Sequence, residues 1–303
     1  MTKASRSAFA DRLTALVEER SSQVCVGLDP DPAVAGEAFP DVPGNTPAEQ
    51  AATAVAMWCE HLLAATGPAC VAVKPQLACF ERLGAPGWAA LARIVDSAHD
   101  QGLLVIADGK RGDVPVSASA YAQALFGSTP SPFGDVPGLG ADAATLNGTL
   151  GRDSLEPLLT GAREAGAGLF VLVRTSNAGA ADLLDLPAPD VPFHERLAAM
   201  VDGLGADLEG QGGLSGLGAV VGATEPAHIA RLRELMPRSP FLVPGVGAQG
   251  GRTTDLSAAF STHPASAIVT ASRSVAGADD PAEAAEILRR EVWDVSCRAL
   301  DTG

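Results

Sequence analysis

Lysine is rare in this chain, and two of its lysines stand where apolar segments end. Only three of the 21 basic residues are lysine, and the others are arginine. Lys74 follows the apolar residues 71–73, and Lys110 follows the apolar run 104–107. Lysine has a compact charge whose pKa shifts readily, whereas arginine stays protonated in proteins. These two positions therefore indicate either proton chemistry or a salt-bridged strand end.

Carboxylates surround Lys110 in the sequence. Asp108 precedes it by two residues, and Asp113 follows it by three. In a strand, residues two apart point to the same face, so Asp108 and Lys110 are expected to lie together. Nearby negative charge favours the protonated form of a lysine. Together with Lys74, this alternating set predicts a charged acid that can donate a proton.

Eight short apolar runs alternate with helical stretches along the chain. Runs that are continuously apolar are typical of strands buried on both faces, as in parallel sheets. Eight such units in 303 residues predict an α/β fold, a TIM (β/α)8 barrel with long βα loops, and a doubly wound open sheet is the alternative. We found no linker, repeat or charge block, so residues 1–303 are expected to form a single TIM-barrel domain. The runs are Val24–Leu28, Cys70–Val73, Leu103–Ala107, Ala143–Leu146, Leu169–Val173, Leu217–Val221, Phe241–Val243 and Ile268–Val269.

Several helices and loops have clear boundary signals. Thr46-Pro47-Ala48-Glu49 is a capping box with proline at the first helical position, ahead of a run that reaches Ala65. Another helix is predicted to open at Thr224-Glu225-Pro226, and amphipathic helices are predicted over residues 1–20 and 281–300. Loops rich in Pro, Gly or Ser are expected to be lids or insertions. These loops are residues 30–46, 127–140 and 178–192.

Polar residues end the apolar runs, and in a TIM barrel the carboxyl ends of the strands meet at the active site. The glycines of the segment 245–251 allow the backbone to approach an anion, and Arg273 offers a fork of donors suited to phosphate. The alternative is a glycine turn with a surface arginine. Phosphate sites in barrels commonly follow strands 7 and 8, where both features occur. The other strand ends contribute Asp29, Asn147 and Ser176.

Composition excludes several classes of protein. The formal net charge of -15 argues against nucleic-acid binding, which needs clustered basic residues. The five cysteines are odd in number and form no C-x-x-C pair, which fits a reducing cytoplasm. No apolar run approaches the roughly 18 residues that span a membrane. The five histidines fall away from the strand ends, so we expect no metal-ligating cluster and read them as surface or packing residues.

Five segments of the chain follow one another in the order of the motifs of a known enzyme family. They include Asp108-Gly-Lys110-Arg-Gly-Asp113-Val-Pro, which is similar to a family signature Asp-x-Lys-x-x-Asp-Ile-Pro. The other four are Lys74-Pro75-Gln76, Thr175-Ser176-Asn177, the glycine loop 243–251 and Ser272-Arg273-Ser274. On these segments the chain resembles the orotidine 5'-phosphate decarboxylases, in particular their longer bacterial (type 2) subgroup. Two departures are visible: Ala178 stands in place of a proline, and Gly148-Thr149 in place of Pro-Tyr.

The resemblance implies decarboxylation of orotidine 5'-monophosphate to uridine 5'-monophosphate in pyrimidine biosynthesis, without cofactor or metal. It implies that Lys110 donates the proton and that Asp108 lies against the departing carboxylate. Lys74 and Asp113 would complete the charge network, with Asp113 reaching the neighbouring subunit's site in a homodimer. The implied substrate-binding residues are Asp29, Ser117, Asn147, Ser176, Gln249, Gly250 and Arg273.

Two rival classes stay open at this point. A metal-dependent 3-keto-sugar-phosphate decarboxylase of the same superfamily shares Asp-x-Lys-x-x-Asp, although the Lys74-Pro75-Gln76 and Thr175-Ser176-Asn177 segments argue against it. A catalytically silent nucleotide-binding protein is the other, and the intact charged set argues against that. Sensitivity to a chelator separates the first class from the predicted enzyme, and turnover separates the second.

Overall fold

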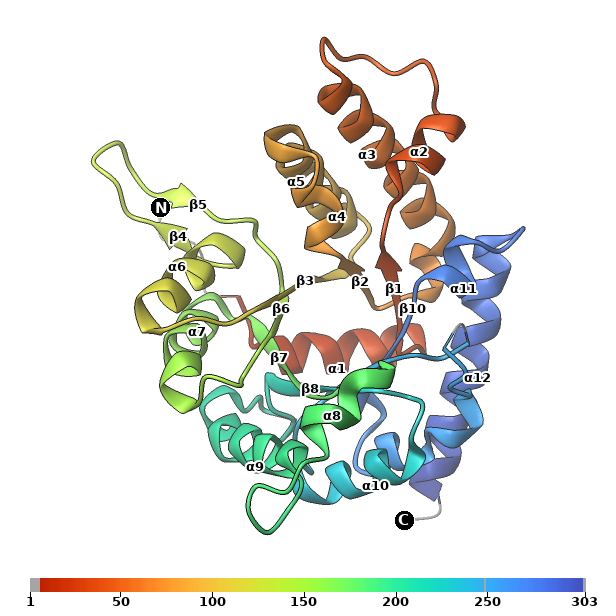
Figure 1. The fold of residues 1–303 in the computed structure, drawn as a ribbon. Helices are drawn as coiled ribbons and strands as arrows, with labels where there is room; N and C mark the ends of the chain where they lie inside the picture. Colours follow the sequence, from red (N-terminus) through yellow and green to blue (C-terminus); the bar gives the residue numbers. More distant parts are fainter. Residues whose placement is uncertain (1–5, 248, 302–303) are drawn as a thin grey trace.

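The computed structural model describes residues 6–247 and 249–301. The third lysine, Lys3, and the two ends of the predicted domain lie outside these residues. Within this part of the chain, eight parallel strands close into a barrel in the order β1-β10-β9-β8-β7-β6-β3-β2 (Figure 1). The TIM-barrel prediction is confirmed, and the open-sheet alternative is wrong. The barrel strands are β1 Val24–Leu28, β2 Ala72–Pro75, β3 Leu104–Arg111, β6 Ala143–Leu146, β7 Gly168–Arg174, β8 Leu217–Val221, β9 Phe241–Pro244 and β10 Ala267–Ala271.

Helices surround the barrel, and those that begin at Pro47, Pro226 and Pro281 start where the sequence signals predict. At the start of α3, the Thr46 side chain accepts from the backbone of Glu49, and the Glu49 carboxylate accepts from the backbone of Thr46, so the capping box is confirmed. No helix in the described chain is both long and apolar enough to cross a membrane. The longer helices are α3 Pro47–Thr66, α5 Gly84–Asp100, α6 Pro115–Leu125, α7 Arg152–Ala165, α9 Phe193–Gly205, α10 Pro226–Leu235 and α12 Pro281–Asp301.

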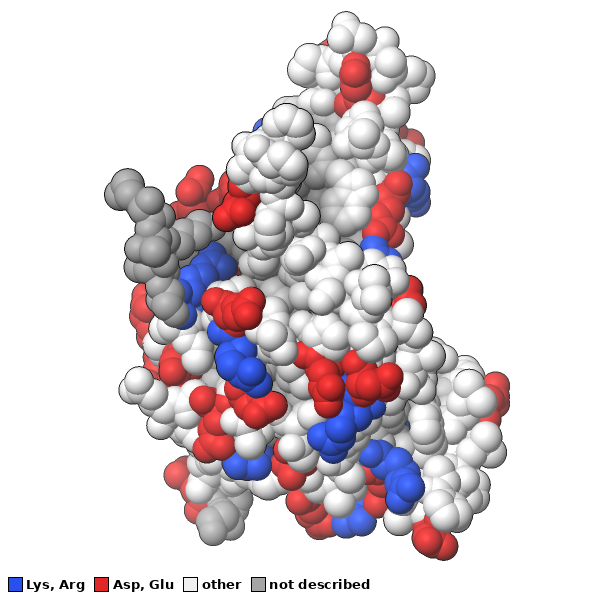
Figure 2. Space-filling model, turned by 90° about the vertical axis from the view of Figure 1, so that its left-hand side faces the viewer, with Lys and Arg blue, Asp and Glu red and all other residues white. Residues whose placement is uncertain are grey.

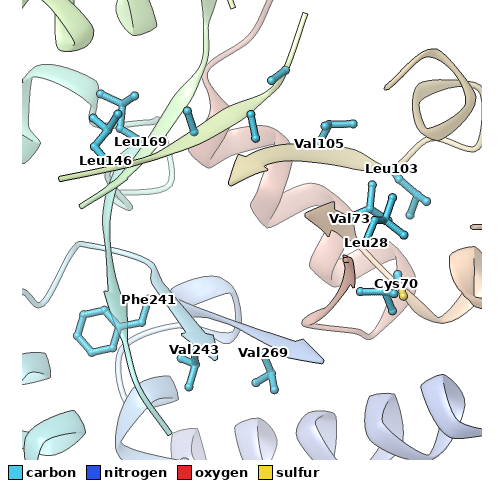
Figure 3. Close-up of a cluster of buried hydrophobic side chains, with 14 of the residues drawn as sticks. Leu28, Cys70, Val73, Leu103, Val105, Leu146, Leu169, Phe241, Val243 and Val269 are labelled. Atoms are coloured by element: carbon cyan, nitrogen blue, oxygen red, sulfur yellow. The ribbon is translucent and has the colours of Figure 1, made fainter. Parts of the chain in front are cut away.

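Alternate residues of each strand face opposite sides of the barrel wall, which divides the core in two. Outward-facing side chains such as Val73, Val105 and Val243 pack beneath the surrounding helices (Figure 3). Inward-facing side chains such as Ala72 and Ile106 fill the barrel interior and form a separate cluster. The interior is therefore a packed apolar core near the amino ends of the strands. Polar residues can face inward only near the carboxyl ends of the strands.

Helix α1 (Phe9–Arg20) closes the end of the barrel where the strands begin, and it lies behind the strands in Figure 1. Leu13 and Val17 are fully buried, and the Phe9 ring meets the ring of Phe170 edge-on with centroids 5.9 Å apart. A side chain at Gly168, the first residue of β7, would collide with Phe9. The predicted helix over residues 1–20 is thus a shorter helix that acts as a plug, and residues 1–5 lie outside the described chain.

Each predicted long loop contains a short element that the sequence did not indicate. The loops 30–46 and 178–192 follow β1 and β7 at the open end of the barrel, and α8 lies in front of the barrel in Figure 1. The loop 127–140 instead follows α6 and leads into β6. The short elements in the three loops are α2 Pro32–Ala38, the hairpin β4 Ser128–Thr129 with β5 Val136–Pro137, and α8 Ala181–Leu184. Two further short helices, α4 Leu77–Glu81 and α11 Arg273–Ala276, follow β2 and β10.

Acidic and basic side chains are interspersed over the face of the molecule that Figure 2 shows. Red and blue atoms alternate there, and much of the surface between them is uncharged. A nucleic-acid surface would instead need clustered basic residues.

Candidate active site

A cavity of about 660 Å³ opens at the end of the barrel opposite α1. Its walls come from the carboxyl ends of the strands and the residues that follow them, as expected for a TIM barrel. Three cations and one carboxylate line it, although the whole chain has a formal charge of -15. The cavity therefore suits an anionic ligand. The lining residues are Lys74, Asp108, Lys110, Thr145, Leu172, Thr175, Ser176, Asn177, Val220, Leu242, Pro244, Gln249, Thr270 and Arg273.

Asp108 is the centre of a hydrogen-bonded network on one wall. Lys74 Nζ lies 2.5 Å from Asp108 Oδ2, and Lys110 Nζ lies 2.7 Å from Oδ1. The Thr145 hydroxyl donates to Oδ1 over 2.8 Å, and the Gln76 amide donates to Oδ2 over 3.2 Å. The carboxylate is thus fixed by four donors and cannot turn away from the cavity.

The two lysines keep this buried carboxylate ionised. Burial by itself raises the pKa of Asp108, but the charges of Lys74 and Lys110 outweigh it and lower the pKa to about 2. Burial lowers the pKa of Lys74, yet the negative charges of Asp108 and Asp29 outweigh that too and leave the Lys74 pKa above its usual value. Three members of the predicted alternating set, Lys74, Asp108 and Lys110, therefore form one charge network, and the fourth, Asp113, does not line the cavity.

Lys110 has an unusual backbone conformation. Its φ is 48°, in the left-handed region that residues with side chains rarely adopt. The regular pairing of β3 with β6 shifts between Ala107 and Arg111, and the Lys110 backbone N–H donates to the Thr145 hydroxyl over 3.0 Å instead. Strain of this kind collects at functional sites. Here it leaves the Lys110 side chain beside Asp108 and 45% exposed.

Ser176, Gln249 and Arg273 line another part of the cavity. The Ser176 hydroxyl donates to Gln249 Oε1 over 2.7 Å, which links the loop after β7 to the loop after β9. Gly247 and Gly250 have φ of 73° and 91°, conformations that glycine adopts readily. At Gly251 an added Cβ would lie 2.7 Å from the Ala223 Cβ, so this glycine is needed for packing. Ala248 of the same loop lies outside the described residues.

Six of the predicted site residues line the cavity: Lys74, Asp108, Lys110, Ser176, Gln249 and Arg273. The other five do not, so the prediction that all the charged strand ends share one mouth is only partly correct. Asp29 is exposed, although its charge acts on Lys74. Asn147 Oδ1 instead accepts from the Thr149 backbone over 3.0 Å. The remaining three are Asp113, Ser117 and Gly250.

Thr145 is a site residue that the sequence patterns did not reveal. Its hydroxyl donates to Asp108 and accepts from the Lys110 backbone, so it fixes both charged residues. The available signal was a single hydroxyl within the apolar run Ala143–Leu146, on the same strand face as Ala143. Thr270 of β10 carries the same signal and also lines the cavity.

Three potential metal ligands also come together, contrary to the expectation that no such cluster exists. Asp185, His194 and His228 each offer a ligand atom, and these atoms lie within 4.8 Å of one another. None of the three lines the cavity. No spacing motif joins residues so far apart along the chain. From the sequence alone, the two histidines therefore resemble ordinary surface or packing residues.

The fold and the site define a class: a TIM barrel whose mouth holds an Asp–Lys charge network and cations for an anionic ligand. Comparison with known proteins gives the family within that class. The family model described as "Orotidine 5'-phosphate decarboxylase / HUMPS family" matches residues 22–288. The chain therefore belongs to the orotidine 5'-phosphate decarboxylase / HUMPS family, as the sequence motifs predicted.

Named relatives match over nearly the whole chain. The orotidine 5'-phosphate decarboxylase of Rhodopirellula baltica is 38% identical over 294 residues, which cover 96% of this chain and 95% of the relative. That of Deinococcus radiodurans is 40% identical over 269 residues, 88% of each chain. A crystal structure of a putative orotidine-monophosphate decarboxylase from Toxoplasma gondii has a TM-score of 0.80 at 30% identity and covers 97% of this chain and 99% of its own.

Proposed function

We infer that this chain decarboxylates orotidine 5'-monophosphate to uridine 5'-monophosphate in pyrimidine biosynthesis, and we propose that Lys110 is the proton donor. These roles rest on one observation. Ionised Asp108 lies between Lys74 and Lys110, in a cavity that Arg273 also lines. One wall of the cavity can act on a reacting carboxylate while the arginine binds the phosphate.

The proposed reaction needs only one proton from the protein. The bond between C6 of the pyrimidine and its carboxylate breaks, carbon dioxide leaves, and the electron pair stays at C6. Lys110 stabilises the developing negative charge there and then donates its proton to C6, after which solvent reprotonates it. Lys74 and Thr145 hold Asp108 beside the departing group. We propose that no cofactor or metal takes part.

We propose that the remaining predicted residues bind the nucleotide. Ser176 would hold the pyrimidine, and Gln249, Gly250 and Arg273 would hold the phosphate, because a guanidinium and backbone N–H groups suit phosphate oxygens. Asp29 is proposed to bind a ribose hydroxyl from the rim, where its carboxylate is exposed. Asn147 and Ser117 complete the predicted set, although the side chain of Asn147 caps its own turn in this structure.

An assay of absorbance loss on orotidine monophosphate, with and without chelator, tests the activity. Turnover that persists in chelator supports the proposal, because the rival sugar-phosphate class depends on a metal. No turnover of orotidine monophosphate, together with chelator-sensitive turnover of a 3-keto sugar phosphate, would instead support the sugar-phosphate class. Tight binding of uridine monophosphate without turnover would support a silent binding protein.

We further propose a homodimer in which Asp113 acts in the neighbouring subunit's site. Asp113 does not line the cavity of its own barrel, and its Oδ1 accepts from the backbone of Val114 over 2.7 Å at the start of α6. Apolar side chains that follow it in the chain are exposed, among them Val116 (85%) and, in the β4–β5 hairpin, Phe133 (99%). Burial of such side chains in a subunit interface would be favourable.

Mixing two inactive variants tests this arrangement. In a heterodimer of Asp113→Ala with Lys110→Ala, one site has both groups and the other has neither. With free exchange about half the molecules are heterodimers, so roughly a quarter of the wild-type activity should return. No recovery, after mass spectrometry has shown that the subunits exchanged, would place Asp113 in its own subunit's site or outside the mechanism.

We also propose that the chain works in the cytoplasm as one domain. The described cysteines are free, and three of them are buried, which suits a reducing compartment. The barrel runs from Val24 to Ala271, and α12 packs back against β1, so residues at both ends of the chain share one core. A single cooperative unfolding transition would support one domain.

A further inference from the structure

A cluster of Asp185, His194 and His228 lies outside the cavity. The three residues come from different elements that are neighbours in the fold: Asp185 follows α8, His194 is in the first turn of α9, and His228 is in the first turn of α10 (Figure 1). The two imidazole rings have centroids 4.9 Å apart. The ligand atoms of the three residues lie within 4.8 Å of one another.

The hydrogen bonds in the cluster leave ligand positions open. His194 is 2% exposed, and its Nδ1 lies 2.8 Å from the Leu184 carbonyl oxygen and 3.2 Å from Asp185 Oδ1. These contacts fix the ring and leave Nε2 as the nitrogen that can bind a ligand. Arg174 donates to both oxygens of Asp185, over 2.8 and 3.0 Å. A carboxylate has about four lone-pair positions, so this bidentate contact leaves others for a second partner.

His228 gives the independent indication of a ligand. Its Nδ1 is buried and has no hydrogen-bond partner among the described residues. A buried polar atom without a partner costs free energy, and such an atom in a native structure points to a missing water or ion. The unpartnered nitrogen belongs to the same group of potential ligands as His194 and Asp185.

We propose that Asp185, His194 and His228 form a binding site for a divalent transition metal of the Zn²⁺ type. Two imidazoles and a carboxylate are donors that Zn²⁺ accepts, and water would fill the fourth position of a tetrahedral site. The metal would cross-link the segment after α8 to α9 and α10 through these three ligands. Arg174 would act as the outer partner that orients the Asp185 carboxylate. Because Arg174 directly precedes Thr175, Ser176 and Asn177, the metal would also anchor the loop that carries this wall of the cavity.

Metal titration of the full-length chain, freed of metal by dialysis against chelator, tests the proposal. We expect one equivalent of Zn²⁺ per chain, a rise in Tm on its addition, and visible absorption bands of a tetrahedral ion when Co²⁺ replaces Zn²⁺. Because loss of an outer partner costs about 10–100-fold in metal affinity, loss of a ligand in His228→Gln should cost at least about 100-fold. His61→Gln changes an exposed histidine outside the cluster and should bind metal like the wild type.

Two outcomes would overturn the proposal. One is a wild-type chain with no stoichiometric Zn²⁺ binding. The other is equal binding by the wild type and His228→Gln, which would place any bound metal elsewhere. If His228→Gln is not folded by circular dichroism, Asp185→Asn replaces it, since Asp185 is only half-buried. The readout is metal content, so it does not depend on the decarboxylase activity, and the two proposals can fail separately.

Discussion

Two buried aspartates lie at opposite ends of the barrel and differ in the groups that hold them. Asp142, directly before β6, is 1% exposed, and Asp108, near the end of β3, is 4% exposed. Burial raises the pKa of both, and hydrogen bonds and nearby charges outweigh it in each case, so that each pKa is lowered to about 2. Both are therefore ionised carboxylates within the barrel, and their electrostatic environments favour ionisation to a similar degree.

The partners of the two aspartates separate a structural site from a reactive one. Asp142 accepts from the guanidinium of Arg12, from His99 over 2.9 Å and from the backbone of Val105 over 2.9 Å. An arginine and a backbone amide do not release a proton, His99 does not line the cavity, and α1 seals this end of the barrel. Asp108 is held by lysines at an open cavity. The same charge thus anchors a helix at one end, and at the other end we propose that it serves proton transfer.

The largest effect is expected from removing the proton donor. Lys110→Ala should abolish turnover and leave nucleotide binding largely intact, because general acids contribute about 10²–10⁴-fold and the stabilisation of charge in the transition state is lost as well. Lys110→Arg gives Asp108 an arginine partner, as Arg12 is for Asp142. This variant should also be inactive, since a guanidinium keeps its proton. Steady-state kinetics and calorimetry with uridine monophosphate measure both quantities. More than about a tenth of wild-type activity in either variant would exclude Lys110 as the donor.

The opposite result is expected at the closed end. Asp142→Asn should lower the free energy of unfolding by about 3 kcal/mol, because Arg12 loses a buried partner. Its kcat should stay near the wild-type value, because Asp142 does not line the cavity. Urea unfolding and kinetics on the same preparation test this. Asp207→Asn is the matched control: Asp207 pairs with Arg163 at the surface, where an ion pair contributes at most about 1 kcal/mol.

The two ends also differ in how far the sequence predicts them. Lys74, Asp108 and Lys110 follow apolar runs, so the rule that strand ends meet at one mouth is enough to predict that they lie together. Asp142 precedes a run and therefore resembles any loop residue, and its partner Arg12 is 130 residues away. Patterns along the chain predict which residues are periodically buried. They do not predict which distant polar residues pair, because such pairs form only when the barrel closes.

The same limit explains the other differences between prediction and structure. Thr145 lies within an apolar strand, and a hydroxyl in such a run does not show which group it will face. The Asp185, His194 and His228 cluster requires three helical segments to pack side by side, and no local spacing signals that. Asp113 lies just before α6 and does not line the cavity, and the role proposed for it is in the neighbouring subunit's site.

A smaller effect is expected from the phosphate side of the cavity. Arg273→Ala should weaken the binding of uridine monophosphate by roughly 1.5–3 kcal/mol, the contribution of a charged hydrogen bond, and leave the binding of uridine nearly unchanged. Calorimetry on both ligands measures the difference. Equal losses for the nucleotide and the nucleoside would mean that Arg273 supports the fold of the loop and does not bind phosphate.

The smallest effect, and the one that compares the two aspartates most directly, is the pH dependence of stability. A carboxylate whose pKa falls from 3.8 to about 2 on folding stabilises the native state above pH 3.8, and this contribution is lost as the pH falls toward 2. Within that window each aspartate should add up to about 1.4 kcal/mol per pH unit to the slope of the unfolding free energy. Urea unfolding at several pH values should therefore give a shallower slope for both Asp142→Asn and Asp108→Asn. Only Asp108→Asn should also lose turnover at neutral pH, because Asp108 lines the cavity and Asp142 does not. An unchanged slope in either variant would mean that its carboxylate is not held ionised by its partners in the folded protein.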